Sequence, residues 1–211
     1  MRIDRPPPGE ELNLGAETEP RVAASVIVLR DAAPDDEGPS VEVLLVKRNP
    51  DASFMGGAWV FPGGSVHDDD GGGPKGAALR ELEEEASVAL GNAGDLVPFS
   101  RWITPAEVKV RFDTWFYVAE APPDAEPRCD GRECVEVRWM RPADALEAGE
   151  RGDMLLVFPT IKHLEQLAEL RSVADALATA RGREVKPILP RVLTRDGAAH
   201  VVLPGEPGYE D

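Results

Sequence analysis

The chain has 211 residues, and its 39 acidic and 23 basic side chains give a formal net charge of −16. A chain this acidic is not expected to be a general binder of nucleic acid or of anionic membranes, because both need a basic patch. The charge is compatible with an anionic substrate that is held through a divalent cation. No apolar run of about 18 residues and no signal-peptide pattern occur, which predicts a cytoplasmic protein without a membrane span.

The length favours one domain with a decorated tail over two domains. Residues 1–20 are rich in Pro, Glu and Gly and are expected to form a flexible or loosely docked arm before a single domain over 21–209. The two cysteines, Cys129 and Cys134, are expected to be free thiols. A disulfide between them would close a very small loop, and too few other zinc ligands lie nearby.

Apolar and β-branched runs predict the first three strands, at 21–30, 41–48 and 58–61. The third strand leads into a Gly-Gly turn. A helix is predicted to begin at Pro74, because proline suits the first helical position and Gly73 can precede it as the N-cap. The small apolar face of this helix consists of Ala77, Ala78, Leu82 and Ala86.

Residues 108–120 give the clearest strand, because their side chains alternate in character. One face carries Val110, Phe112, Thr114, Phe116 and Val118, and the other carries Arg111, Asp113, Trp115 and Tyr117. A further strand is expected at 133–140 and helices at 142–149, 159–170 and 172–180, followed by strand-like fragments and a tail. Strands mixed with helices, without regular βαβ alternation, predict an α+β fold or a mixed α/β/α sandwich with a mixed β-sheet.

Three glutamates of the first predicted helix, Glu81, Glu84 and Glu85, have the i, i+3, i+4 spacing that places side chains on one face. Their mutual repulsion is relieved by a hard divalent cation such as Mg²⁺, which prefers oxygen ligands. Neighbouring carboxylates also shift one another's pKa, which suits a general base. The alternative is an ordinary acidic helix face exposed to water.

The preceding segment strengthens the metal-site interpretation. Gly63 can bring a main-chain carbonyl close to a metal, because no side chain stands in the way. Arg80 lies at the edge of the glutamate stripe and could hold a carboxylate by a bidentate contact. These separate features point to one place in the fold.

The segment from Gly64 to Val88 resembles the Nudix box, with Arg80-Glu81 and Glu84-Glu85 in the matching order. It departs from the family pattern at two places. The first acidic position falls on Asp70 when counted from Gly64, and on Gly72 when counted back from Arg80. The late glycine of the pattern is Ser87, so the helix must end differently or Ser87 must adopt a strained backbone.

The resemblance implies a mixed α/β/α fold that hydrolyses a diphosphate linkage with Mg²⁺ or Mn²⁺. It implies that the metal ligands are Gly63, Asp70, Glu81, Glu84 and Glu85, and that Arg80 belongs to the catalytic group. A further glutamate outside the box often serves such proteins as ligand or base. Glu133 matches that position and Glu136 is the alternative, while either could equally be a surface residue of an edge strand.

The stretches "FMGGAWVFPGGSVHDDD", "RFDTWFYVAE" and "FPTIKHLEQL" also resemble the Nudix branch that includes peroxisomal acyl-coenzyme A diphosphatases. That resemblance implies coenzyme A or an acyl-coenzyme A as substrate. The alternatives are an ADP-ribose or NADH diphosphatase, a catalytically silent ligand sensor or interaction module, and a protein with an acidic surface helix and no site. A homodimer is compatible with all of them.

The polar face of the strand at 108–120 has two interpretations. Arg111, Asp113, Trp115 and Tyr117 could form a wall for the substrate, with the arginine on a phosphate and the rings against a base. They could instead hold an Arg–Asp pair on a half-buried sheet.

Overall fold

The structure is a computed structural model that describes residues 2–3, 13, 15–33, 40–195 and 198–210. The expectation of a flexible arm therefore falls partly on residues outside the described part. The described residues of the arm from 13 onward are docked on the loop that precedes β7, whereas Arg2–Ile3 pairs with Ala199 and His200 near the C-terminus. Asn13 N donates to Glu107 O at 2.7 Å, and Thr18 Oγ1 donates to Lys109 O at 3.0 Å.

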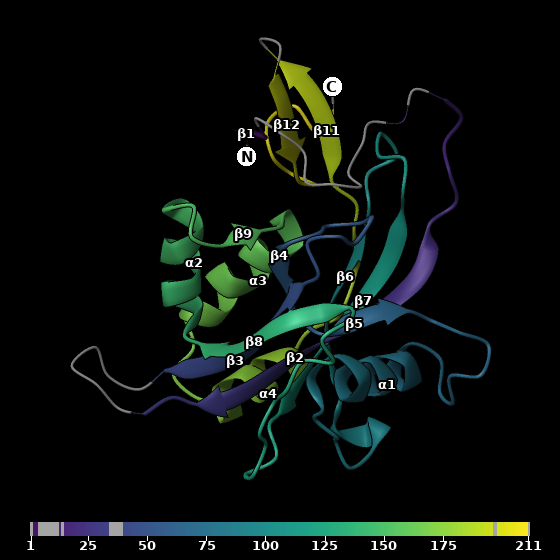
Figure 1. Cartoon of the computed structure of the whole chain (residues 1–211). Helices are drawn as coiled ribbons and strands as arrows, with labels where there is room; N and C mark the ends of the chain where they lie inside the picture. Colours follow the sequence, from purple (N-terminus) through teal and green to yellow (C-terminus); the bar gives the residue numbers. More distant parts are fainter. Residues whose placement is uncertain (1, 4–12, 14, 34–39, 196–197, 211) are drawn as a thin grey trace.

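A mixed sheet forms the centre of the molecule, as predicted (Figure 1). Its strands run in the order β10-β6-β7-β2-β3-β4-β9, while β5 pairs with β2 and β8 pairs with β3. The strands are β2 (Arg21–Asp31), β3 (Val41–Arg48), β4 (Ala58–Val60), β5 (Gly63–Ser65), β6 (Val97–Ile103), β7 (Phe112–Glu120), β8 (Cys134–Met140), β9 (Leu155–Leu156) and β10 (Pro187–Ile188).

Helices cover both faces of this sheet (Figure 1). On one face α1 (Pro74–Ala86) packs Leu82 against Val26 and its neighbours. On the other face lie α2 (Pro142–Glu150), α3 (Phe158–Ala168) and α4 (Val173–Arg181), around Ile27 and Leu45. The alternation of Val26 and Ile27 toward opposite faces places β2 in the middle of an α/β/α sandwich.

A second, small sheet stands above this body (Figure 1). It consists of β1 (Arg2–Ile3), β12 (Ala198–Val202) and β11 (Arg191–Arg195), in that order, so the two ends of the chain meet there. Within the described residues, no helix is long and apolar enough to cross a membrane.

The strands around the first glycines create the opening for a site. β2 pairs with β3 only through Leu29–Asp31, and its other end pairs with β5 through Ala23–Ser25. The Gly-Gly segment, which was expected to be a turn, is therefore a short strand. Strands β2 and β3 are thus not paired over the rest of β2, where β5 takes the place of β3. There Glu85 of α1 lies between Gly63 of β5, at 3.0 Å, and Arg48 at the end of β3, at 3.9 Å.

Candidate functional site

Helix α1 brings two glutamates into the protein interior. It ends at Ala86, and Ser87 takes a left-handed conformation with φ 55°, which the sequence named as one of two possibilities. Glu81 and Glu85 are buried, at 7% and 2% exposure, on the edge of the face that packs on the sheet. Burying two carboxylates is costly unless their oxygens find partners, so their surroundings define what the site can do.

Glu81 lies directly against the Gly-Gly strand. A Cβ atom added at Gly64 would stand 2.2 Å from Glu81 Oε1, so only glycine allows this approach. Burial raises the pKa of Glu81, and the contact with Arg80 opposes that shift. The charges of Glu84 and Glu133, which line the same cavity as Glu81, raise its pKa further.

Glu85 is the most enclosed carboxylate of the helix. Its Oε2 accepts a hydrogen bond of 3.0 Å from Gly63 N, whereas its Oε1 is buried and has no hydrogen-bond partner among the described residues. The nearest cationic group is Arg48 Nη1, at 3.9 Å from Oε1. Burial raises the pKa of Glu85 to about 7, with a contribution from the charge of Glu81.

Arg80 ties the loop before α1 to the glutamates. Its Nε and Nη2 donate to the two oxygens of Asp70 at 2.7 and 3.1 Å, and Nη2 also donates to Ser65 O at 3.1 Å. Its Nη1 donates to Glu81 at 2.8 Å and to Glu84 at 2.9 Å. The hydrogen bond from Arg80 lowers the pKa of Asp70 to about 2. Both Asp70 oxygens are therefore engaged by Arg80, which does not favour Asp70 as a metal ligand.

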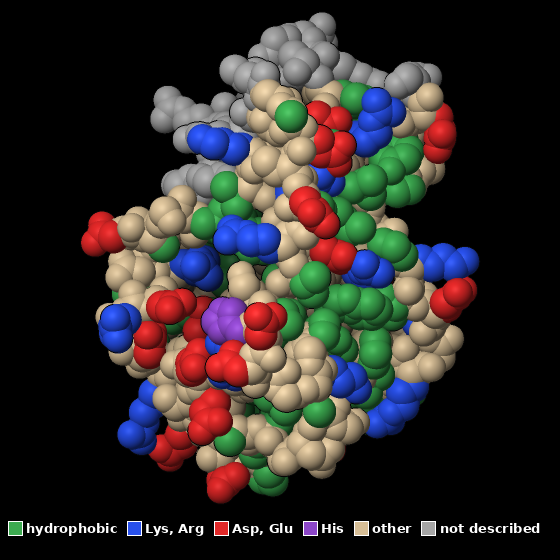
Figure 2. All heavy atoms as spheres, turned by 90° about the vertical axis from the view of Figure 1, so that its right-hand side faces the viewer, with side chains coloured by type: hydrophobic (Ala, Val, Ile, Leu, Met, Phe, Trp, Pro, Cys, Tyr) green, Lys and Arg blue, Asp and Glu red, His purple; other side chains and the backbone are tan. Residues whose placement is uncertain are grey.

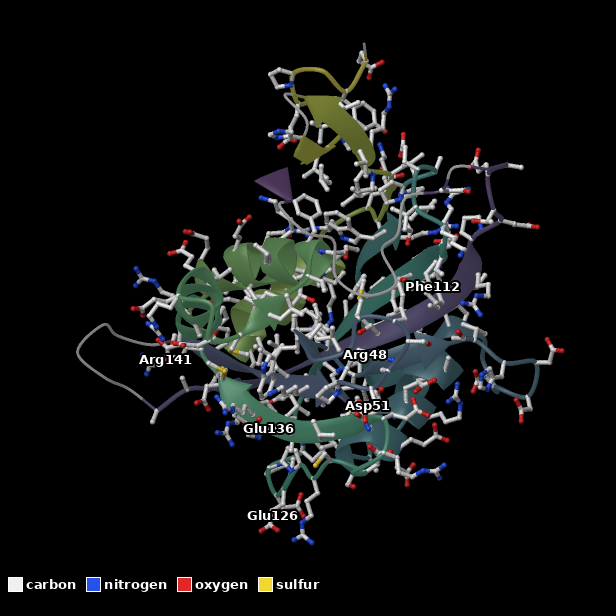
Figure 3. All side chains as sticks on the ribbon, turned by 45° about the horizontal axis from the view of Figure 1, so that its top comes forward. Arg48, Asp51, Phe112, Glu126, Glu136 and Arg141 are labelled. Carbon is white, nitrogen blue, oxygen red and sulfur yellow. The ribbon has the colours of Figure 1, made fainter. Side chains whose placement is uncertain are left out.

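Two acidic positions left open by the sequence have clear locations. Gly72 lies in the turn before α1 and offers no carboxylate, so Asp70 is the loop residue that reaches the site. Glu133, immediately before β8, is exposed and lines the same cavity as Glu81 and Glu84. Glu136 does not line that cavity: its Oε1 accepts a hydrogen bond of 2.6 Å from Arg138 Nε, and it lies along β8 away from Arg48 (Figure 3).

The acidic group has the donor chemistry of a divalent-metal site but not a closed ligand cage. Among the described residues, no three acidic, histidine or cysteine side chains are gathered tightly enough to enclose an ion. The unpartnered Oε1 of Glu85, together with the carboxylates of Glu81 and Glu133, nevertheless fits a hard cation, because these are oxygen donors and such ions keep part of their water shell.

A cavity of about 550 Å³ opens beside these glutamates. Its acidic end carries Glu81, Glu84 and Glu133. The remaining walls are mainly apolar and come from β6, β7, α3 and the β11–β12 hairpin; they include Trp102, Phe112, Phe116, Phe158, Val192 and Val201. Figure 2 shows acidic side chains gathered on one part of this side of the molecule, with a hydrophobic area beside them.

The predicted polar face of β7 points away from this cavity. Arg111 is buried and donates to Thr104 O at 3.0 Å and Thr18 O at 2.7 Å, so it fastens the N-terminal segment. Asp113 pairs with Arg101 rather than with Arg111, with a hydrogen bond of 2.7 Å from Arg101 Nε.

The two aromatic residues of the same face pack on the α1 side of the sheet. Trp115 and Tyr117 stack with an interplanar angle of 15° and ring centroids 6.4 Å apart. Burial raises the pKa of Tyr117 to about 12. The opposite face of β7, with Phe112, Thr114 and Phe116, lines the cavity instead. The structure therefore brings none of the four wall candidates to the cavity.

Sequence reasoning missed Arg48 and the aromatic lining. Arg48 is the last residue of β3 and lines the cavity. The alternation within 108–120 had grouped Phe112, Thr114 and Phe116 correctly, so the missing information was which face meets the ligand space. Nothing in the local pattern of "LLVKR" distinguishes Arg48 from a surface arginine.

The protein is thus an α/β/α sandwich in which an acidic helix borders a cavity. Comparison of the chain with known proteins identifies its family. The chain belongs to the NUDIX domain family, whose model matches residues 19–159. It is thus a member of a hydrolase family that acts on nucleoside diphosphate derivatives and generally uses divalent metal ions. The Caenorhabditis elegans protein nudix hydrolase 7 is 28% identical over 210 residues, which cover 80% of this chain and 70% of that protein.

Solved structures agree with this assignment. The NUDIX hydrolase of Alicyclobacillus acidocaldarius is 26% identical, with a TM-score of 0.68 over 77% of this chain and 97% of that chain. The MutT NUDIX hydrolase of Burkholderia pseudomallei is also 26% identical, with a TM-score of 0.51 over 71% and 99%. The NUDIX domain of Shewanella oneidensis NrtR, solved with ADP ribose, shares the fold at 20% identity and a TM-score of 0.53 over 71% and 86%.

Proposed function

We propose that the protein hydrolyses a diphosphate linkage in a nucleoside diphosphate derivative with the help of Mg²⁺ or Mn²⁺. The observation that carries this proposal is the buried Glu85, whose Oε1 has no hydrogen-bond partner. It lies beside Arg48 and on the helix that brings Glu81 and Glu84 to a cavity of about 550 Å³. A buried carboxylate oxygen without a hydrogen bond is costly, and Arg48 at 3.9 Å offsets only part of that cost. Membership of the family supplies a reason to keep it, because a divalent cation would bind there.

In this proposal Glu81 and Glu85 would hold the cation. Gly63 fixes Glu85 through its N–H, and its carbonyl is a further candidate ligand. A bound divalent ion polarises phosphoryl oxygens and lowers the pKa of a water molecule. Glu133 lines the same cavity as Glu81, and in this proposal it would accept the proton of the attacking water.

Arg80 is a positioning residue. It holds Glu81 and Glu84 in one orientation and joins them to the loop through Asp70. The water oxygen forms a bond to one phosphorus, the bond from that phosphorus to the bridging oxygen breaks, and two monophosphates leave. The cation is essential here because a chain with a net charge of −16 repels a free diphosphate.

The substrate that we propose is coenzyme A or an acyl-coenzyme A. Support comes from the apolar walls beyond the glutamates, which suit an extended ligand with an uncharged arm. The alternative is an ADP-ribose or NADH diphosphatase; a family domain solved with ADP ribose shares the fold. A ligand sensor without turnover is the remaining alternative.

The experiment is a comparison of kcat/KM for coenzyme A, an acyl-coenzyme A, ADP-ribose, NADH and dGTP, first with Mg²⁺ and then with Mn²⁺. The proposal predicts two monophosphate products and the highest value for a coenzyme A compound. A preference for ADP-ribose or dGTP would replace the substrate while keeping the reaction. Absence of turnover with every compound, despite binding, would indicate a sensor.

A further inference from the structure

The lining of the cavity changes from acidic to apolar near the end of β3. Its acidic end has three glutamates, while its far end is formed by apolar side chains of β6, α3 and the hairpin. Among the described residues that line it, only Arg48 and Arg80 are lysine or arginine. A diphosphate that enters this cavity therefore has two candidate arginines, and their hydrogen bonds distinguish them.

Arg80 has no donor left for a substrate. A guanidinium carries five N–H groups. Arg80 makes five hydrogen bonds, two to Asp70 and one each to Ser65 O, Glu81 and Glu84. Binding a phosphate through Arg80 would release the loop or one of the glutamates, so Arg80 is fully committed to positioning.

Arg48 has the opposite arrangement. Its Nε donates to Phe54 O at 3.2 Å, which fixes the direction of the guanidinium. Nη1 lies 3.9 Å from Glu85 Oε1, which is too long for a hydrogen bond. Its two terminal nitrogens thus donate no hydrogen bond to any described residue, although the side chain is only 21% exposed and faces the Glu85 carboxylate.

The backbone explains how Arg48 reaches this position. The pairing of β3 with β8 shifts register between Lys47 and Arg48, and Arg48 lies opposite Cys134. Such an irregularity turns a strand and redirects a side chain, and it is typical of the rim of a functional site. Figure 3 shows Arg48 near the middle of the molecule, with Phe112 on one side of it and Asp51 on the other in this view.

Arg48 stands at the boundary between the two parts of the cavity. It is next to Glu85 on one side. On the other side its partner Phe54 contacts Phe112, with ring centroids 5.2 Å apart, and Phe112 belongs to the apolar wall. A phosphate between the glutamate-bound cation and this arginine would have its other substituent directed along the aromatic side chains.

We propose that Arg48 binds a phosphate oxygen of the substrate at this boundary, through its terminal nitrogens. The proposal rests on the proposed function, because it takes the ligand to be a diphosphate. It goes beyond that function by assigning the second contact of the diphosphate, opposite the cation, to one residue. A guanidinium suits this role because it can donate two parallel hydrogen bonds to a phosphate.

The test measures binding of a non-hydrolysable probe, adenosine 5′-(α,β-methylene)diphosphate, by calorimetry in saturating Mg²⁺. Arg48→Gln is expected to weaken binding by about 10- to 100-fold, as for loss of a hydrogen bond to a charged group. The affinity of Arg48→Lys for the probe is expected to lie between those of the wild type and Arg48→Gln, because lysine keeps the charge but loses the paired donors. Arg138→Gln, an exposed arginine of the neighbouring strand β8, is the matched control and should bind as the wild type does.

Two further measurements separate substrate binding from a structural role. Adenosine without phosphate should bind the wild type and Arg48→Gln equally, and the Mn²⁺-induced rise in melting temperature should persist in Arg48→Gln. If Arg48→Gln does not fold, Arg48→Lys carries the test. Unchanged probe affinity in the variants, no binding by the wild type, or loss of the Mn²⁺ response in parallel with probe binding would overturn the proposal.

Failure of the Arg48 contact can be distinguished from failure of the proposed hydrolase function. A wild type that binds the probe through Arg48 but hydrolyses none of the diphosphates would refute the enzyme and leave the Arg48 contact in place. A wild type that hydrolyses them while Arg48→Gln binds the probe normally would refute the contact and leave the enzyme in place.

Discussion

Arg80 and Asp70, ten residues apart, form a bidentate ion pair in which Nε lies 2.7 Å from Oδ1 and Nη2 lies 3.1 Å from Oδ2. The pair joins the loop before α1 to the helix that carries the glutamates. It gives the acidic residue of the long loop a role in holding Arg80, while Arg80 in turn orients Glu81 and Glu84.

Removing the charge of this loop residue tests that role. Asp70→Asn is expected to lower the free energy of unfolding by about 1 to 2 kcal/mol, because Arg80 loses its charged partner. It should also lower kcat, since the glutamates are held less firmly. Asp68→Asn, an exposed neighbour, is the control and should change neither quantity. Equal behaviour of the two variants in urea unfolding and kinetics would contradict the assignment.

The same pair has a pH signature. The pKa of Asp70 is lowered from 3.8 to about 2, so the folded protein holds this proton less tightly than the unfolded chain does. The stabilisation is therefore fully present above 3.8 and is lost as the pH falls toward about 2. The difference in unfolding free energy between wild type and Asp70→Asn should shrink in that window and stay constant above it.

The contribution of Glu85 to stability should change with pH in the opposite direction to that of Asp70. Its pKa is raised from 4.5 to about 7, so in metal-free buffer the folded protein loses stability as the pH rises through this range. The loss amounts to at most about 3 kcal/mol. Glu85→Gln removes this titration and should be more stable than the wild type at pH 8, when both are measured by thermal unfolding in EDTA.

Mn²⁺ should reverse that order, because binding to the folded state stabilises it. At pH 8 the ion is expected to raise the melting temperature of the wild type much more than that of Glu85→Gln. Glu83→Gln, an exposed residue of the same helix, should respond as the wild type does. An equal Mn²⁺ response in Glu85→Gln would show that the ion binds elsewhere.

The end of α1 offers a stabilising substitution. Ser87 has φ 55° and ψ 32°, a left-handed conformation that is unfavourable for residues with a Cβ atom. Ser87→Gly should raise the free energy of unfolding by about 0.5 to 1 kcal/mol, after the entropy of glycine in the unfolded chain is included. Ser87→Ala keeps the Cβ atom and should give no gain. Chemical unfolding of the three proteins decides the matter, and a gain in the alanine variant would refute this explanation.

The two faces of β7 make separate predictions about the substrate. Phe112→Ala removes part of the cavity wall and is expected to raise KM for a bulky diphosphate by about tenfold, in line with the loss of an aromatic contact. Trp115→Ala removes a ring of the opposite face and should leave KM unchanged. If only Trp115→Ala raised KM, the ligand would have to bind on the α1 side of the sheet.

Much of the fold could be predicted from periodicity. The strand prediction at 108–120 matches β7 from Phe112 onward, and the helix that begins at Pro74 matches α1. The strand β5 was missed because Gly63 and Gly64 have no side chains to alternate, and its pairing with β2 spans some forty residues. The strand β6 (Val97–Ile103) was not assigned either.

The site was only partly accessible from the sequence. Helical spacing grouped Glu81, Glu84 and Glu85, but spacing could not show that Glu84 is exposed while Glu85 is buried. Asp70 becomes the partner of Arg80 only because the loop before α1 folds back onto the helix. Arg48 is a candidate phosphate ligand only because its terminal nitrogens donate no hydrogen bond within the described residues. These are properties of contacts between distant segments, and local patterns do not encode them.

The most direct test of the central claim is phosphorus NMR of coenzyme A, ADP-ribose and NADH incubated with the wild-type protein, Glu85→Gln and Glu83→Gln. With Mg²⁺ or Mn²⁺, the wild type and Glu83→Gln are expected to convert the diphosphate signal of at least one compound into two monophosphate signals. Glu85→Gln, or the wild type in EDTA, should leave the signal unchanged. Full conversion by Glu85→Gln, or conversion by the wild type in EDTA, would contradict a cation held by the glutamates of α1.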